Sequence, residues 1–195
     1  MTSLPHRLLL LLATAAIALV AATGASADAR QTLKRVANQE CPGANLVPDA
    51  SNLSVVLDAT SCLIDRERAR SGVAGLSRRS VLRRMASGYA RQMVQEGFFG
   101  HVTPAGASFG QRIAVSGYPP RRGAWRAGEN LAWGTGPMAT PRDVVRRWLA
   151  SPPHRRNLLD RRFRETGIGI ALGTPGTDSR GRPSATYVQE LGARG

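Results

Sequence analysis

Several features that would assign a function directly are absent from this sequence. It contains two cysteines, which are not in a CxxC arrangement, so no reactive thiol pair is indicated. It has no HExxH pattern of the zinc proteases, no internal repeat and no long low-complexity tract. After residue 22 it has no apolar run long enough to span a membrane. Any chemistry must therefore come from a few separate residues of an ordinary globular chain.

The length and composition fit one domain. The chain has 195 residues, and about 168 remain after an expected 27-residue leader, within the usual size of one domain. Hydrophobic residues make up 42% and charged residues 21%, close to the globular average, so a sizeable core is expected and general disorder is not.

The charge is strongly positive, and almost all of it is arginine. Lysine and arginine number 27 against 13 acidic residues, which gives +14, and Lys34 is the only lysine. This balance favours anionic surroundings such as wall polymers or lipid head groups. An arginine-rich composition can equally reflect codon usage, so the charge does not identify a partner.

The first 27 residues have the pattern of a secretory leader. His6 and Arg7 precede an apolar run over residues 8–22, and residues 25–27 read Ala-Ser-Ala, a cleavage signature. The competing interpretation is an uncleaved anchor, but about 15 apolar residues are short for a spanning helix. Removal of Arg7 with the leader leaves +13. We expect a secreted, monomeric protein without a membrane span in its mature chain.

Export makes the two cysteines informative. Cys41 and Cys62 allow one intramolecular disulfide in an oxidising compartment. Closing that loop stabilises the fold by roughly 3 kcal/mol in the chain-entropy treatment. The competing interpretation, a reactive thiol, is less favoured because no histidine lies nearby in the sequence.

Apolar spacing and capping residues predict the helices. Residues 28–50 are expected to form an irregular arm with one helical turn, followed by helices over residues 52–70, 77–96 and 108–116. Ser77 is the expected cap of the second of these helices. A further helix begins at Thr140, where a capping threonine is followed by proline and an early carboxylate.

The end of the chain favours strands. Residues 166–172 and 185–191 are short β-leaning runs joined by a long Gly/Pro-rich stretch, and residues 129–133 predict a third strand. Helices first and strands late, without βαβ alternation, predict an α+β domain in which helices cover an antiparallel sheet.

Several prominent side chains have a structural explanation. The charge run over residues 65–70 is expected to be a solvated helix face. Tyr89 and Met93 repeat at helical spacing and are expected in the core.

The candidates for chemistry are two histidines and one glutamate. His6 leaves with the leader, so imidazole chemistry must use His101 or His154, and both lie in turn-rich sequence. Together with Glu129 they form a feasible set for a divalent metal such as zinc, with a fourth position for water. The three residues are far apart in sequence, so surface or satisfied core positions remain the competing interpretation.

Neighbouring polar and aromatic residues also have competing interpretations. Ser151 close to His154 raises the alternative of a nucleophile and base oriented by Glu129, but no nucleophile-elbow motif is present. An asparagine beside a turn commonly bonds backbone groups, so Asn130 and Asn157 are expected to be structural. For three aromatic residues, burial is favoured over a role in lining a cleft: Phe98, Phe99 and Trp133.

Five segments of the chain, in the right order, resemble the bacterial branch of the CAP superfamily. This is the group of cysteine-rich secretory, antigen 5 and pathogenesis-related-1-like domains, also called SCP domains. The resemblance covers residues 51–192. The segments are residues 62–76, GFFGH at 97–101, GENLAWG at 128–134, WLASPPHRRNLL at 148–159 and FRETGIG at 163–169.

The resemblance implies a fold and a site. The family has an α-β-α sandwich with a central antiparallel sheet flanked by helices, and an open cleft lined by two histidines and, in many members, two acidic residues. By motif these are His101, Glu129 and His154, while Ser151 stands where many members have a second acid. A hydroxyl is a poorer ligand than a carboxylate, so His101, Glu129 and His154 would hold zinc or another divalent metal only weakly.

Two functions follow from the resemblance. The first is a secreted binding module whose cleft, lined by His101, Glu129, His154 and Ser151, takes an extracellular lipid, sterol or anionic cell-wall component. The alternative is a peptidase-like hydrolase that uses the same cleft through metal-assisted or acid/base chemistry. Nucleic-acid binding is not expected, because the arginines are spread along the chain and export argues against it. The expected organisation is a signal peptide at 1–27, an arm at 28–50 and a CAP domain at 51–192.

Overall fold

The computed structural model describes residues 26–176 and 181–195. The expected leader lies almost wholly outside the described residues. Within the described ranges, no helix combines the length and the apolar character needed to cross a membrane.

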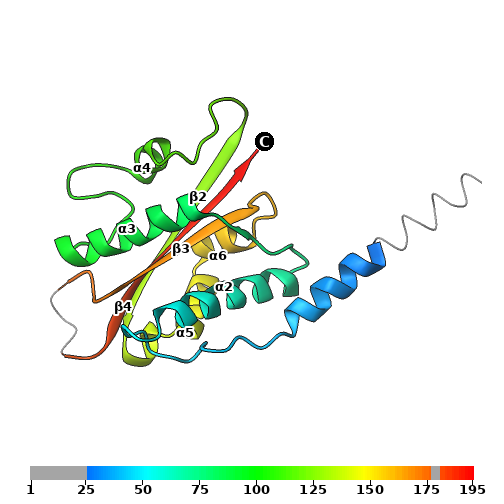
Figure 1. Ribbon diagram of the computed structural model, residues 1–195, viewed down its shortest axis with the longest axis horizontal. Helices are drawn as coiled ribbons and strands as arrows, with labels where there is room; N and C mark the ends of the chain where they lie inside the picture. The colour runs from blue at the N-terminus through cyan, green and yellow to red at the C-terminus, as the bar shows by residue number, and fades with distance from the viewer. Residues whose placement is uncertain (1–25, 177–180) are drawn as a thin grey trace, which may run out of the picture.

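A four-stranded sheet forms the centre of the molecule (Figure 1). Its order is β1, β3, β4, β2. The antiparallel pairing of β3 with β4 was predicted, and β2 pairs antiparallel with the other side of β4. The two-residue strand β1 runs parallel to β3, so the sheet is mixed rather than purely antiparallel. The bounds are β1 Ser77–Arg78, β2 Trp125–Thr135, β3 Glu165–Leu172 and β4 Ser184–Arg194.

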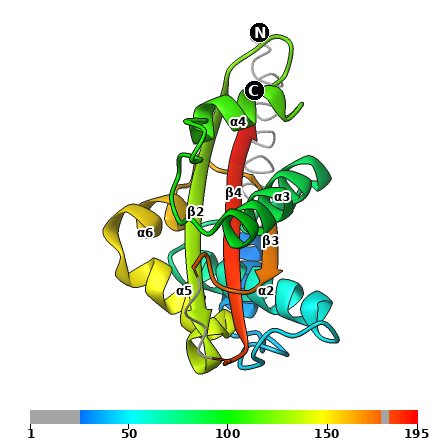
Figure 2. The same cartoon turned by 90° about the vertical axis from the view of Figure 1, so that its left-hand side faces the viewer.

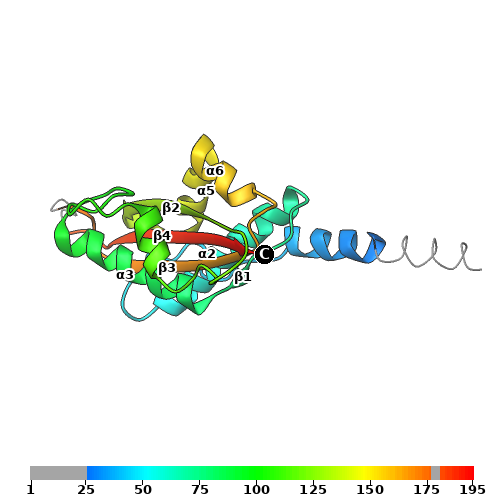
Figure 3. The ribbon, with the colours of Figure 1, turned by 90° about the horizontal axis from the view of Figure 1, so that it is seen from above.

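Helices cover both faces of the sheet, as the α+β prediction required. Figure 3 shows α3 on one side and α5 and α6 on the other. Two core clusters match this division, since α2 and α5 pack on Ile168, Ile170 and Tyr187, whereas α3 packs on Ala171 and Val188. The helix bounds are α2 Leu53–Arg70, α3 Ser80–Glu96, α4 Phe109–Val115, α5 Pro141–Ala150 and α6 Pro152–Leu159, with a short 3-10 helix at Gly136–Ala139.

Local capping signals placed two helix starts correctly. The Ser108 hydroxyl accepts a hydrogen bond from the backbone N–H of Gln111 in a capping box that opens α4. Thr140 caps α5 through the N–H of Asp143, with Pro141 at the first position. These signals lie within four residues of the helix ends, so the sequence alone can show them.

The predicted cap at Ser77 was wrong. The backbone N–H of Ser77 donates to the carbonyl of Arg164, and the N–H of Arg79 donates to the carbonyl of Thr166. These bonds hold residues 77–78 in the sheet as β1, and α3 begins only at Ser80. Pairing with a strand almost 90 residues away overrides the local signal.

The prediction of a solvated charged face on α2 was also wrong at its centre. Arg68 is 1% exposed. Its guanidinium donates to four carbonyl oxygens, those of Ala74, Leu158, Asp160 and Phe163. Arg70, one half-turn away, is half exposed and pairs with Glu67. The buried guanidinium fastens the segment between α6 and β3 to α2.

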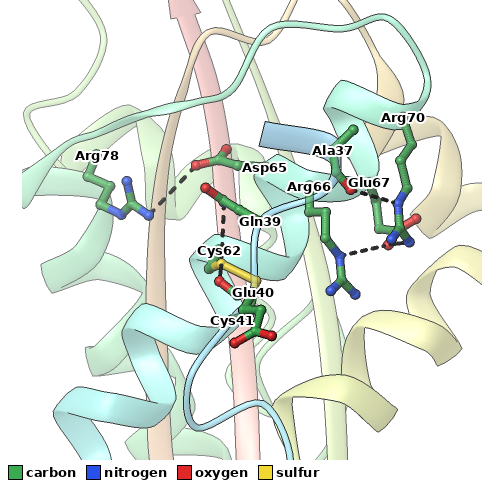
Figure 4. Close-up of a disulfide and its surroundings, with 10 residues drawn as sticks. All are labelled: Ala37, Gln39, Glu40, Cys41, Cys62, Asp65, Arg66, Glu67, Arg70 and Arg78. Carbon is green, nitrogen blue, oxygen red and sulfur yellow. Dashed lines mark hydrogen bonds and ion pairs between the residues drawn. A yellow bond between two sulfur atoms is a disulfide. The ribbon is translucent and has the colours of Figure 1, made fainter. Parts of the chain in front are cut away.

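The N-terminal arm is attached to the domain by the expected disulfide. Residues 26–37 are helical, which is more than the single turn expected, and residues 38–50 are largely irregular. Cys41 bonds to Cys62 on α2, with Cα atoms 5.7 Å apart (Figure 4). The carbonyl of Ala44 also accepts a hydrogen bond from the N–H of Arg142 on α5.

Glu165, the first residue of β3, makes a pH-dependent contribution to the free energy of unfolding. Burial alone would raise its pKa, but hydrogen bonds from Arg194, Tyr118 and Arg79 outweigh burial and lower the pKa from 4.5 to about 2. A carboxyl with a depressed pKa stabilises the fold above its ordinary pKa, and this contribution is lost as the pH falls toward 2.

We therefore expect the unfolding free energy of the Glu165→Gln variant to fall less steeply with decreasing pH than that of the wild type. Between pH 5 and pH 2 the wild type should lose about 2 kcal/mol more unfolding free energy than the variant, allowing for the partial exposure of Arg79 and Arg194. Urea denaturation at a series of pH values measures the difference. If the unfolding free energies of the two proteins decreased equally as the pH falls, Glu165 would not be paired as described.

Candidate functional site

The candidate site lies along strand β2, at the edge of the sheet. Figure 2 shows β2 beside α5 and α6 at this edge. A groove of about 420 Å³ follows the strand, and its polar lining residues are Arg147, Ser151 and His154. Its remaining lining residues are mostly apolar: Phe99, Leu131, Ala132, Trp133, Gly134, Met138 and Trp148.

Two predicted site residues are in direct contact. His101 follows the turn after α3, and its Nδ1 lies 2.7 Å from Oε1 of Glu129 on β2. The Glu129 side chain is 1% exposed, whereas that of His101 is 53% exposed. A buried carboxylate thus holds one nitrogen of an imidazole that is open to solvent, an arrangement that fixes the orientation of the ring.

Arg112 completes this contact and was not foreseen from the sequence. Its guanidinium donates to Oε2 of Glu129 at 2.6 Å and to the carbonyl of His101 at 2.8 Å. The same guanidinium lies 3.5 Å from the centre of the Tyr89 ring, close enough for a cation–π contact. Tyr89 is in the core, as predicted, and it also supports Arg112. No local signal in the sequence distinguishes Arg112 from the many other arginines.

Glu190 is a second carboxyl at the site that the sequence interpretation missed. It is opposite Glu129 in the β2–β4 register and is fully buried. In the described part of the chain, neither of its side-chain oxygens has a hydrogen-bond partner. Burial raises the pKa of Glu190 well above its ordinary value, and the negative charge of Glu129 raises it further. Both effects favour the neutral form of Glu190.

His154 approaches the site from α6. Burial lowers its pKa below the ordinary 6.5, and the nearby charge of His101 lowers the pKa further. Side-chain amides connect its helix to β2. Asn130 donates to the carbonyl of His154, and Asn157 donates to the carbonyl of Glu129 and to the side-chain oxygen of Asn130. These bonds confirm that both asparagines have a structural role.

The triad of Ser151, His154 and Glu129 is not formed. Both oxygens of Glu129 are bound to other partners, His101 and Arg112, so this carboxylate does not orient His154. Ser151 is the N-cap position of α6 and lines the groove. The structure thus brings His101, Glu129 and His154 to one region but pairs the acid with His101.

The arrangement of donors does not fit a divalent metal. In the described residues, no group of three or more His, Cys, Asp or Glu side chains is placed to hold an ion. Glu129 is already bound to Arg112, whose positive charge opposes a second cation at the same oxygens. The three suggested ligands therefore lie near one another without forming a metal site.

Two aromatic residues line the groove instead of being buried. Phe99 is 47% exposed and Trp133 is 39% exposed, so the prediction of burial was wrong for both. Trp133 is on the edge strand where the groove leaves it open to solvent. Phe98 behaves as predicted, because it packs partly buried against the cluster under α3.

Comparisons with known proteins agree with this fold. The model of the cysteine-rich secretory protein family, CAP, matches residues 63–190. YkwD of Bacillus subtilis is 30% identical over 107 residues, which cover 55% of this chain and 39% of YkwD. The chain therefore spans about two fifths of the length of that relative.

Two solved structures have the same fold. An extracellular SCP-domain protein of Bacillus anthracis aligns with a TM-score of 0.52 at 23% identity, covering 72% of this chain and 40% of its own. An outer surface protein of Borrelia burgdorferi aligns with a TM-score of 0.53 at 22% identity, covering 76% of this chain and 97% of its own. Because the family model matches about two thirds of the residues, the chain belongs to the cysteine-rich secretory protein (CAP) family.

Proposed function

We propose that this CAP domain is exported and binds an extracellular ligand in the groove along β2. The disulfide between Cys41 and Cys62 supports export, because such bonds persist in oxidising compartments. The B. anthracis and B. burgdorferi structures are of an extracellular and an outer surface protein. The expected leader at residues 1–27 fits the same location.

The wall of the groove supports a ligand with an apolar part, such as a lipid, a sterol or a cell-wall component. The observation that carries this proposal is the exposure of Phe99, Trp133 and Met138 around one hollow of about 420 Å³. Large exposed apolar side chains that gather on a concave surface mark binding sites. His154 and Ser151 supply polar groups at the same groove, which would orient the polar end of the ligand.

Hydrolysis is the second candidate function, and one contact favours it. The hydrogen bond between Nδ1 of His101 and Oε1 of Glu129 orients the imidazole, and a general base must be oriented in this way toward the proton that it accepts. In this proposal His101 accepts a proton from an attacking water molecule, and Glu129 stabilises the resulting imidazolium. Since the donors do not fit a metal, the reaction would be of the acid/base type.

Binding is tested with two fluorescent probes, cis-parinaric acid and dehydroergosterol, and with soluble peptidoglycan fragments. We expect the Trp133→Ala variant to weaken the binding of whichever probe the groove takes by about tenfold, because it loses the burial of an aromatic face. Trp125→Ala is the matched control, since Trp125 is similarly exposed but does not line the groove. Equal effects of the two variants, or no binding of any probe, would overturn the binding proposal.

The hydrolase alternative is tested on the same preparations. Release of product from casein or a p-nitrophenyl ester is measured for the wild type and for folded His101→Ala and Glu129→Gln variants. Turnover that both variants abolish supports acid/base hydrolysis by this pair. Absence of turnover, together with probe binding that depends on Trp133, supports a binding module.

A further inference from the structure

A group of arginines lies outside the groove, on the surface formed by α6, the segment after it and the first residues of β2. We call it the arginine band, and its members are Arg126, Arg155, Arg156, Arg162 and Arg164. Two hollows connect them. The first, of about 600 Å³, is lined by Arg155, Arg156 and Arg162. The second, of about 330 Å³, is lined by Arg126, Arg162 and Arg164, and also by Arg194, which is paired with Glu165 and is not counted in the band.

Most of the charge in the arginine band is free to bind a ligand. In the described residues only one member, Arg162, forms an ion pair, with Asp160 at 2.7 Å. Asp160 is also the one acidic residue that lines either hollow. Other arginines of the chain are paired, as Arg79 is with Glu165 and Arg147 with Asp143. Four of the five members therefore form no ion pair with a described residue, and the band differs from other unpaired arginines because its members gather around two adjacent hollows.

The backbone under the arginine band is held in place before any ligand binds. The segment between α6 and β3 is fastened by the buried Arg68, which binds the carbonyls of Leu158, Asp160 and Phe163. The Phe163 side chain is buried, and the N–H of Arg164 donates to the carbonyl of Gly192 on β4. A preorganised set of cations loses less conformational entropy on binding than the same cations on a free loop.

We propose that the arginine band binds a linear anionic polymer whose repeating phosphate or carboxylate groups contact successive guanidinium groups. Two adjacent hollows that share Arg162 suit an extended chain better than a single small anion. Arginine forks match both phosphate and carboxylate oxygens. A membrane surface fits less well, because the apolar side chains of the first hollow, Leu149 and Leu159, are partly buried, and the second hollow adds one large exposed apolar side chain, Trp125. This surface is separate from the groove, so the inference goes beyond the proposed function.

The test compares two triple variants with the same net charge. Arg155→Gln, Arg156→Gln and Arg164→Gln remove three members of the band. Arg83→Gln, Arg84→Gln and Arg91→Gln remove three exposed arginines of α3 that form no ion pair in the described residues. Binding of polyphosphate and of alginate to the full mature chain is measured by fluorescence anisotropy over a range of salt concentrations. These two probes distinguish a phosphate polymer from a carboxylate polymer.

We expect the band variant to bind the preferred polymer at least about tenfold more weakly and with a shallower salt dependence, and the α3 variant to change by less than about threefold. Equal losses in both variants would show that only net charge matters and would overturn the proposal. Absence of binding to both polymers would also overturn the proposal. A third contradicting result is that the band variant loses binding to phosphatidylglycerol vesicles but keeps its binding to the polymers. Probe binding in the groove should be unchanged in the band variant, which separates this result from the test of the proposed function.

Discussion

Replacing Arg68 by methionine is expected to lower the free energy of unfolding by about 3 to 5 kcal/mol. The guanidinium is 1% exposed and donates to carbonyls of two separate segments, that of Ala74 after α2 and those of residues 158, 160 and 163 between α6 and β3. Methionine fills much of the space but leaves these oxygens buried without donors. Removing one partner of a buried polar network has a larger effect than losing a surface contact, because the remaining groups stay desolvated.

The matched control is Arg70→Met on the same helix. Arg70 is half exposed, and its ion pair with Glu67 lies at the surface, so we expect a loss below about 1 kcal/mol. Urea denaturation monitored by tryptophan fluorescence measures both variants. Similar losses for Arg68→Met and Arg70→Met would contradict the central position of Arg68.

The second large effect is expected at Gly169, where helix α3 crosses strand β3. A Cβ atom at this position would lie 2.2 Å from backbone atoms of Ala86 and Ser87. Gly167, two residues earlier, is in equally close contact with Leu82 and Arg83. Backbone atoms cannot move aside as a flexible side chain can, so Gly169→Ala must displace the helix. We expect a loss of about 3 kcal/mol, at the upper end of overpacking effects.

Displacement of α3 should also change the positions of side chains in the candidate site. This helix carries Tyr89, which supports Arg112, and Arg112 binds Glu129. The control is Gly88→Ala on α3, where a Cβ meets nothing within 4 Å. Because alanine favours helix, this control should be neutral or more stable by up to about 1 kcal/mol. Thermal unfolding with calorimetry measures both variants, and a neutral Gly169→Ala would mean that helix and strand are further apart than described.

Local patterns predicted most of the fold, because their causes lie within a few residues. The capping signals at Ser108 and Thr140 and the apolar spacing of the two long helices depend only on near neighbours. The errors at Ser77 and Arg68 have a common origin in contacts with the segment around β3, which lies almost 90 residues further along the chain. Apart from Ala74, the partners of these two residues lie outside any local pattern.

The residues of the candidate site were also predicted only where a local sequence motif contains them. The sequence motifs singled out His101, Glu129 and His154, and the fold brings them to one edge of the sheet. Arg112 and Glu190 were missed, because their importance comes from what faces them across the fold. Glu190 is one residue of a β-leaning run, and only the register with β2 places it opposite Glu129. The roles of these residues in binding or hydrolysis remain predictions for the experiments above.

The most direct test concerns the proximity of the two imidazoles, those of His101 and His154. Proton titration of the histidine rings by NMR should give a His154 pKa below 6.5, and the pKa should rise in His101→Asn while staying below that value, because burial remains. A His154 pKa that does not respond to the replacement of His101 in a folded variant would contradict the shared site.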